Sequence, residues 1–291
     1  MSQIWRGVSG GIEVLENVNE MADLPDISTI NSEGVWYIES GGFGPDYIAP
    51  TNWDSSAGEF TDWFSLFDGR ILADIPGSED LHAHYDAQTL NLSDGEAVNV
   101  WEDETANGND LAKEGGEPNF VADAINGNPV VSLSDDSDLL ETDFDTSISQ
   151  PNTTIIVGRF TEIDDSIFTF YFGGIDQSTS HNFAQGNDGD DLWISTDTSL
   201  RDQNSAADTD YHIWTAHFDS NDAFLEQDGT EIASGDVGDN DMGSLRLGNF
   251  HNMDRPASIE VGEILLYEKD KTDIITEIEE YIDDKWGISV S

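Results

Sequence analysis

Residues 81–111 form the most informative segment of this chain, LHAHYDAQTLNLSDGEAVNVWEDETANGNDL. Gly95 centres a turn, and Trp101 is most simply explained as a core residue. The Asn-Gly-Asn run at 107–109 can adopt left-handed backbone conformations without strain. The segment therefore predicts extended structure joined by tight turns and loops.

From this segment to about residue 268, short apolar runs are separated by Gly, Asn and Asp. In the run at 212–218, alternate residues have the two-residue period of a strand. The regular spacing of the runs predicts an antiparallel sandwich or jelly roll. The runs lie at 98–101, 129–133, 153–160, 167–172, 192–195, 212–218, 223–227, 244–247 and 259–267.

The end of the chain has a different period. Thr272 is placed to cap a helix over 273–285, and Gly287 is placed to end it. Such a helix would carry one apolar face and pack on an edge of the sandwich. The face would consist of Ile274, Ile275, Ile278, Tyr281 and Ile282.

The segment 81–111 resembles the opening of concanavalin A-like/laminin-G-like lectin domains. In that family a YDA, a Gly-centred turn and a W-x-D-x-S-G-N-G-N-D-L run recur, and Thr105-Ala106 here replaces the usual Ser-Gly. The matching residues are Tyr85, Asp86, Ala87, Gly95, Trp101, Asp103, Asn107, Gly108, Asn109, Asp110 and Leu111.

Further matches follow in the family's order, at 128–131, 228–229, 245–248, 261–267 and 278–287. Asp228-Gly229 is also a hairpin signal in its own right, because the turn needs positive φ. The resemblance implies a mostly β chain, in which 79–291 form a concanavalin A-like antiparallel β-sandwich (jelly roll) with a C-terminal helix. A small β-rich domain at 1–78 would precede it.

The first 78 residues are rich in aromatic residues and turn formers. Strand-like pieces lie at 12–18, 34–38 and 64–66, a turn is expected at 24–26, and 76–80 have the composition of a linker. Residues 14–25 and 34–38 resemble short modules at the start of phage tail-fibre and virion-appendage proteins. This resemblance implies a module for virion attachment and oligomerisation.

The charge balance indicates that the protein is adapted to concentrated salt. There are 61 Asp and Glu against 10 Lys and Arg, a formal net charge of −51. In ordinary salt such a surface would repel itself, but at molar salt the screening length is about 3 Å and the repulsion largely disappears. Because 10% of the residues are aromatic, a folded, salt-adapted protein fits better than a disordered chain.

Composition also narrows the partners and the chemistry. The absence of a basic patch argues against nucleic-acid binding and against an anionic membrane. The chain has no Cys, which excludes disulfides and thiolate ligands. It has no run of about 18 apolar residues, and its start lacks the basic and apolar regions of a signal peptide, so we expect neither membrane insertion nor ordinary secretion.

The fold hosts both lectins and glycosidases, so it does not decide the function. A retaining glucanase of this fold carries Glu-x-Asp-x-x-Glu or Glu-x-Asp-x-Glu on one strand. The nearest sequence here, at 162–166, lacks the second Glu. We therefore expect no enzymatic activity, with glycoside hydrolysis as a remaining alternative.

Two acidic loops are candidates for holding Ca²⁺ or another cation, because lectins often bind Ca²⁺ through loop oxygens. The alternative is that loops of a salt-adapted protein are acidic without binding any ion. The candidate ligands are Asp103, Asn107 and Asn109 in one loop, and Asp188, Asp190 and Asp191 in the other.

His82, His84 and Asp86 would share one strand face and could grip a metal, although a structural role is the favoured interpretation of the histidines. Sugar binding usually needs an aromatic ring beside amide and carboxylate groups. Phe183, Trp193 and Phe250 lie near loops rich in Gly, Asn and Asp, and are the candidate ligand-binding residues.

The combined prediction is a structural protein of the virion surface of a haloarchaeal virus, either a tail fibre, a spike or a capsid turret, in a hypersaline extracellular setting. We expect a homo-oligomer, a trimer or a pentamer, that contacts other virion proteins through its N-terminal module and binds a host surface glycan or glycoprotein. The alternative is a cell-surface or secreted haloarchaeal lectin-like domain.

Overall fold

The computed structural model divides the chain into two compact units, Met1–Ile71 and Leu72–Ser291. In the first unit it describes the backbone of five strands. In the second it describes residues 75–290 apart from 136, 164–168, 187–190, 203–206, 250–255 and 257. No helix in the described part of the chain is long and apolar enough to cross a membrane.

The first unit contains one antiparallel five-stranded sheet with the order β2-β1-β3-β4-β5. The predicted strands at 12–18 and 34–38 are present as β2 and β3, the latter shifted toward its C-terminal side. The prediction at 64–66 covers only the end of β5, and the predicted turn at 24–26 lies outside the described residues. The strands are β1 (Ser2–Val8), β2 (Gly11–Val18), β3 (Trp36–Glu39), β4 (Pro45–Asp54) and β5 (Glu59–Ser65).

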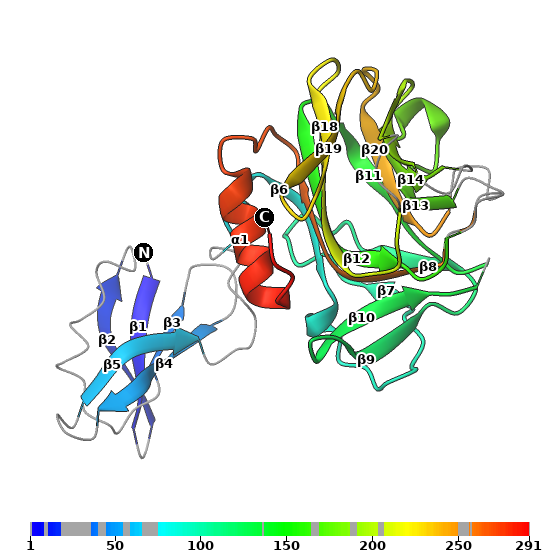
Figure 1. Ribbon diagram of the computed structural model, residues 1–291. Helices are drawn as coiled ribbons and strands as arrows, with labels where there is room; N and C mark the ends of the chain where they lie inside the picture. Colours follow the sequence, from blue (N-terminus) through cyan, green and yellow to red (C-terminus); the bar gives the residue numbers. More distant parts are fainter. Residues whose placement is uncertain are drawn as a thin grey trace. The chain divides into compact units, whose positions relative to one another are not determined.

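The second unit is an antiparallel β-sandwich of two facing sheets, which confirms the predicted fold class (Figure 1). The back sheet has the order β19-β18-β17-β12-β21-β10-β9, with β6 also paired to β21. Its strands are β6 (Leu81–Asp86), β9 (Asn119–Ile125), β10 (Asn128–Leu133), β12 (Asn152–Phe160), β17 (His212–Phe218), β18 (Ala223–Gln227), β19 (Thr230–Gly235) and β21 (Ile259–Tyr267).

The front sheet has the order β16-β15-β14-β13-β20-β11-β8-β7. Its strands are β7 (Val100–Trp101), β8 (Leu111–Gly115), β11 (Leu139–Ile148), β13 (Thr169–Gly173), β14 (Asn182–Gln185), β15 (Leu192–Ser195), β16 (Ser199–Arg201) and β20 (Met242–Leu247).

Two apolar clusters flank the back sheet, as the alternation of side chains along a strand requires. On β17, Trp214 and Phe218 face the front sheet and belong to the main core, together with the predicted core residue Trp101. Ile213 points the other way, into a second cluster beneath the helix α1 (Ile275–Trp286). The back sheet is therefore buried on both faces.

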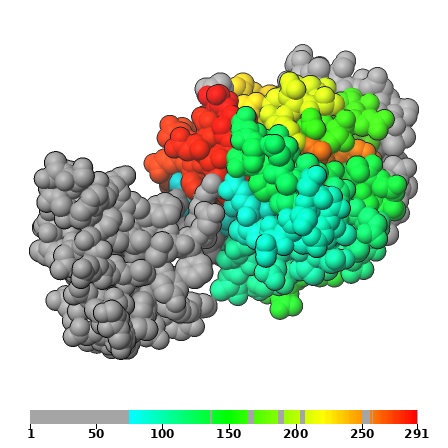
Figure 2. All heavy atoms as spheres, turned by 90° about the horizontal axis from the view of Figure 1, so that it is seen from below, coloured from blue at the N-terminus to red at the C-terminus, as the bar shows by residue number. Residues whose placement is uncertain are grey.

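Helix α1 covers the outer face of the back sheet, and the C-terminal residues lie against the body of the second unit (Figures 1 and 2). Its residues Ile278, Ile282 and Trp286 are buried on the side that faces the sheet. The ring of Trp286 packs directly on Gly262 of β21, where a Cβ atom would lie 2.7 Å from the indole. Gly287 ends the helix with φ of 68°, as predicted.

The predicted helix start was wrong. Thr272 does not cap the helix, because its backbone N–H and its hydroxyl both donate to Asp270 Oδ1. The helix begins two residues later than predicted, at Ile275, after Ile274, which makes no side-chain cap. Thr272 instead closes a local turn around an Asp, a use that Ser and Thr share with capping.

Two short features join the strands. Asp228 and Gly229 have φ of 51° and 76° and form the predicted turn between β18 and β19. Residues 76–80, predicted as a linker, belong to the second unit: Ser78–Asp80 form the 3-10 turn η4, and Tyr267 donates a hydrogen bond to the Pro76 carbonyl.

Candidate functional site

A hollow of about 590 Å³ lies on the outer face of the front sheet, and we call it the Trp193 pocket. The register aligns Asn182, Ser195 and Ser199 across β14, β15 and β16. The adjacent residues Phe183 on β14 and Ile194 on β15 point into the main core. Because successive side chains on a strand point to opposite faces, the three polar residues point outward. The remaining lining residues come from Trp193, from the segment 176–178 and from Thr196, Asp197 and Asn240.

Trp193 is the aromatic residue of the pocket wall. It lies beside Ala184 in the register and forms a small cluster with Ala184 and Phe170, separate from the main core. The Phe170 ring meets it edge-on with centroids 5.3 Å apart. Trp193 is 7% exposed, so its neighbours fix its orientation and leave only a small part of it to solvent.

The polar floor of the pocket is held by hydrogen bonds between neighbouring strands. Asn182 donates from Nδ2 to the Ser195 carbonyl and hydroxyl, each at 3.3 Å, and its Oδ1 accepts from Ser180. Ser180 in turn accepts from the Gly174 N–H. These contacts fix the amide before any ligand arrives, which lowers the entropy cost of binding.

The loop 236–241, which contributes Asn240, is held in place from behind. Gln150 donates to the carbonyls of Gly238 and Asn240 at 3.1 and 2.9 Å. Burial lowers the pKa of His181 to about 4, so its ring is neutral near pH 7, and Nε2 lies 2.9 Å from the Asn240 carbonyl. Thr196 donates to the Val237 carbonyl at 2.8 Å.

The pocket is polar and carries negative charge. Asp176 and Asp197 are its ionisable lining residues, and both are exposed. Asp176 caps the 3-10 turn η6 (Gln177–Thr179) by accepting from the Ser178 N–H and hydroxyl. The other polar lining groups are amides and hydroxyls, which can both donate and accept. The arrangement can therefore hold a ligand that is rich in hydroxyl groups and has an apolar face.

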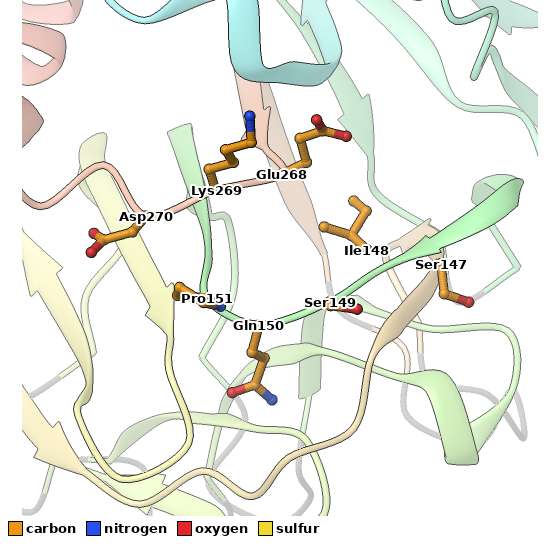
Figure 3. Close-up of a pocket in the computed structure, with 8 residues that line it drawn as sticks. All are labelled: Ser147, Ile148, Ser149, Gln150, Pro151, Glu268, Lys269 and Asp270. Carbon is orange, nitrogen blue, oxygen red and sulfur yellow. The ribbon is translucent and has the colours of Figure 1, made fainter.

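A second hollow, of about 540 Å³, lies between the end of β11 and the segment after β21, and we call it the Ser147 hollow. Figure 3 shows its two walls, residues 147–151 and 268–270, with the Gln150 side chain pointing away toward the loop 236–241. None of the described residues that line it is aromatic, and Lys269 binds Asp80 at 2.6 Å. It lacks the apolar surface that usually orients a sugar ring.

Comparison with known proteins yields the fold and no family. No known family model and no curated protein matches this chain. The botulinum neurotoxin serotype D binding domain matches with a TM-score of 0.53 and 12% identity, over 75% of this chain and 56% of its own. The binding domain of botulinum neurotoxin DC, in complex with SialylT, matches with a TM-score of 0.50 and 8% identity, over 72% and 55%.

Domain 4 of a GH43 extracellular arabinanase from Geobacillus stearothermophilus, in complex with arabinotriose, matches with a TM-score of 0.48 and 21% identity, over 65% of this chain and 92% of that domain. That score is too low to carry an argument. This chain spans about half the length of the neurotoxin domains. At these identities the likeness establishes the β-sandwich fold alone.

Three aromatic residues were predicted to bind a ligand, and of the two that the structure describes, Trp193 lines a pocket and Phe183 does not. Phe183 is fully buried in the main core between Tyr171 and Trp214. It cannot offer its ring to a sugar, and the prediction for it is corrected for that reason. Phe250 lies outside the described residues.

The predicted cation loop at 103–109 serves another purpose. The Asp103 carboxylate accepts four hydrogen bonds, from the backbone of His84, Thr105 and Asn109 and from the Thr105 hydroxyl. Asn107 and Asn109 donate to backbone carbonyls of β6. These side chains fasten the loop to the strand. The Asp103 carboxylate is engaged by four donors, which favours this structural role for it over cation binding. Cation binding through the side-chain oxygens of Asn107 and Asn109 stays a prediction.

In the other predicted loop, Asp188 and Asp190 lie outside the described residues. Asp191 is described, and it pairs with Arg201 at 3.5 Å. The described part of this loop thus contributes one carboxylate, already facing a cation.

The structure separates the three residues predicted to bind a metal together, His82, His84 and Asp86. His84 and Asp86 lie with Glu263 in a buried group compact enough for a metal ion. However, Lys285 Nζ sits 2.6 Å from both Asp86 Oδ2 and Glu263 Oε1 and supplies the positive charge itself. His82 instead meets the Phe144 ring edge-on. The group is an ion-pair centre that fastens α1 to the back sheet.

Sequence reasoning missed most of the pocket. Asn182, Ser195 and Ser199 lie in separate short strands, and their alignment depends on the register of β14, β15 and β16. Asn240 reaches the pocket because Gln150 and His181 hold its loop from distant positions. The one available signal was Trp193, an aromatic residue flanked by apolar residues on a strand beside acidic loops.

Proposed function

We propose that the second unit is a non-catalytic glycan-recognition domain that binds its ligand in the Trp193 pocket. The observation that carries the proposal is one aromatic wall, Trp193, beside the fixed amide of Asn182 and a hydroxyl-rich floor. Sugars present an apolar ring face and a rim of hydroxyl groups, and this lining complements both. A solved structure of the same fold, the receptor binding domain of botulinum neurotoxin C/D mosaic serotype, is in keeping with it.

The wider role follows from charge and domain organisation. We propose that the chain is a virion-surface protein of a haloarchaeal virus, a tail fibre, spike or capsid turret that displays the glycan-recognition domain in brine. The net charge of −51 supports a hypersaline setting. The separate five-stranded unit supports a division between attachment and display.

Oligomerisation is assigned to the first unit. Among the described side chains of the second unit, Val100 is the only large apolar residue that is exposed, at 45%. Stable oligomer interfaces have apolar centres, so we place the contacts of the homo-oligomer, a trimer or a pentamer, and those with other virion proteins in residues 1–71.

Glycoside hydrolysis is the second candidate, because two carboxylates, Asp176 and Asp197, line the same pocket. A glycosidase needs one carboxyl group that its surroundings keep protonated. Both residues are exposed, which supports binding over catalysis. Release of reducing sugar from a retained glycan would revive the enzymatic alternative.

The test is retention on a glycan array in molar salt, using the full chain. Ser199→Leu places bulk in the Trp193 pocket, and Ser147→Leu makes the same change in the other hollow. Both serines are exposed, so each change should alter stability by no more than about 0.5 kcal/mol. We expect Ser199→Leu alone to abolish retention. Retention that survives Ser199→Leu, or no retention by the unmodified chain, would contradict the proposal.

A further inference from the structure

We propose that the Trp193 pocket selects neutral glycans and excludes sugars that carry a carboxylate or a sulfate. This inference rests on the proposed function and names the ligand class of the same site. It is argued from the acidic residues that line the pocket and from the ion pairs that the Lys and Arg side chains of the domain form.

Among the residues that the structure describes, the lining contains acids and no bases. Asp176 and Asp197 are present, and none of the described lining residues is Lys, Arg or His. An anionic sugar is bound most strongly by a guanidinium or ammonium group within hydrogen-bonding distance, and adjacent carboxylates repel it. A neutral sugar needs only donors and acceptors, and its hydroxyl groups can donate to the two carboxylates.

The cation on the neighbouring strand β16 is already engaged. Arg201 stands opposite Trp193 in the register of β15 and β16, with its guanidinium carbon 5.6 Å from the Trp193 ring centroid. Its Nη1 lies 3.5 Å from Asp191 Oδ2. Recruiting Arg201 to an anionic ligand would therefore separate it from Asp191 and leave that carboxylate without its counter-charge.

The same holds for the rest of the described domain. Each Lys and Arg whose side chain the structure describes forms an ion pair with Asp or Glu. Arg246, for example, binds Glu141 at 2.6 Å. With few cations and many acids, the described part of this domain commits its Lys and Arg to internal pairs. The described surface offers no spare cation to an anionic ligand.

High salt does not remove the selection. At molar salt the screening length is about 3 Å, which suppresses the field of distant acids such as Glu280 on α1. The carboxylates of Asp176 and Asp197 would be in contact with a bound sugar, where few ions can intervene. Selection therefore depends on these two residues and not on the net charge of the protein.

The test is an array of matched pairs in molar salt, in which each neutral oligosaccharide stands beside its sialylated, uronate or sulfated derivative. We expect the full chain to be retained by neutral members only. Preferential or equal retention of the acidic members would overturn this inference and leave the proposed function intact. Retention of neither member would overturn the proposed function itself.

Two charge-matched variants sharpen the result. Asp197→Lys puts a cation in the pocket, whereas Glu280→Lys makes the same change in net charge at an exposed residue of α1, on the opposite sheet. We expect Asp197→Lys to raise the affinity for acidic glycans about tenfold over Glu280→Lys, since one charged hydrogen bond is gained. Equal behaviour of the two variants would contradict selection by the lining.

Discussion

The outer faces of the two sheets are used in opposite ways. The outer face of the back sheet is sealed by α1, and its buried charges satisfy one another through Lys285, Asp86 and Glu263. The outer face of the front sheet is hollowed, and its polar groups are hydrogen-bonded at the base while they line a pocket. Buried polar groups that are hydrogen-bonded within the protein stabilise the fold, whereas exposed lining residues such as Asp197 and Ser199 can contact a ligand.

A tryptophan marks each face. Trp286 is fully buried and donates from Nε1 to Glu263 Oε2 at 2.6 Å. Trp193 lines the pocket. Substitution of Trp286 should therefore lower the stability of the protein, whereas substitution of Trp193 should weaken ligand binding.

The largest effect is expected at the sealed face. Lys285→Met leaves Asp86 and Glu263 buried without their cation and should lower the free energy of unfolding by about 3–5 kcal/mol. Chemical denaturation in molar salt measures this loss. Adding Glu263→Gln to the same chain should recover part of it, because one uncompensated charge is removed. A loss below about 1 kcal/mol, typical of an exposed pair, would contradict the description of the centre as buried.

The next effect contrasts the two tryptophans. Trp193→Phe keeps an aromatic ring against Phe170 but reduces the wall of the pocket, and should weaken glycan affinity about tenfold, or about 1.4 kcal/mol. Trp286→Phe removes the hydrogen bond to Glu263 and should cost about 1–3 kcal/mol of stability with unchanged affinity. Titration of a retained glycan and denaturation of both variants would check this. Equal loss of affinity in both would remove the distinction between the faces.

The smallest effect concerns pH. Burial, followed by the nearby charge of Glu279, raises the pKa of Glu226 from 4.5 to about 7. Between these values the folded state retains a proton that the unfolded chain has released, so stability falls as pH rises through this window. Glu226→Gln should be more stable than the parent above pH 7, by about 1 kcal/mol after allowance for partial exposure. The advantage should vanish near pH 4.5; one that persists unchanged there would exclude this titration as the cause.

The sequence predicted elements better than it predicted sites. Strands such as β17 and β21 were predicted to the residue because a run rich in apolar residues, ended by an acidic residue, is a local property. β14 and β16 were missed, since their few residues carry too little periodicity. Asp103 was predicted to bind a cation, but its carboxylate accepts hydrogen bonds from backbone N–H groups, which no sequence pattern reveals. The pocket depends on register, which is set by the whole sheet.

The central claim is that the hollowed face of the front sheet binds the ligand. A crystal structure of the full chain, soaked with the neutral glycan it retains most strongly, tests this claim most directly. The account predicts the sugar in the Trp193 pocket, with hydroxyl groups on Asn182 and Asp197 and a ring near Trp193. A sugar in the Ser147 hollow, or anywhere away from the front sheet, would contradict it.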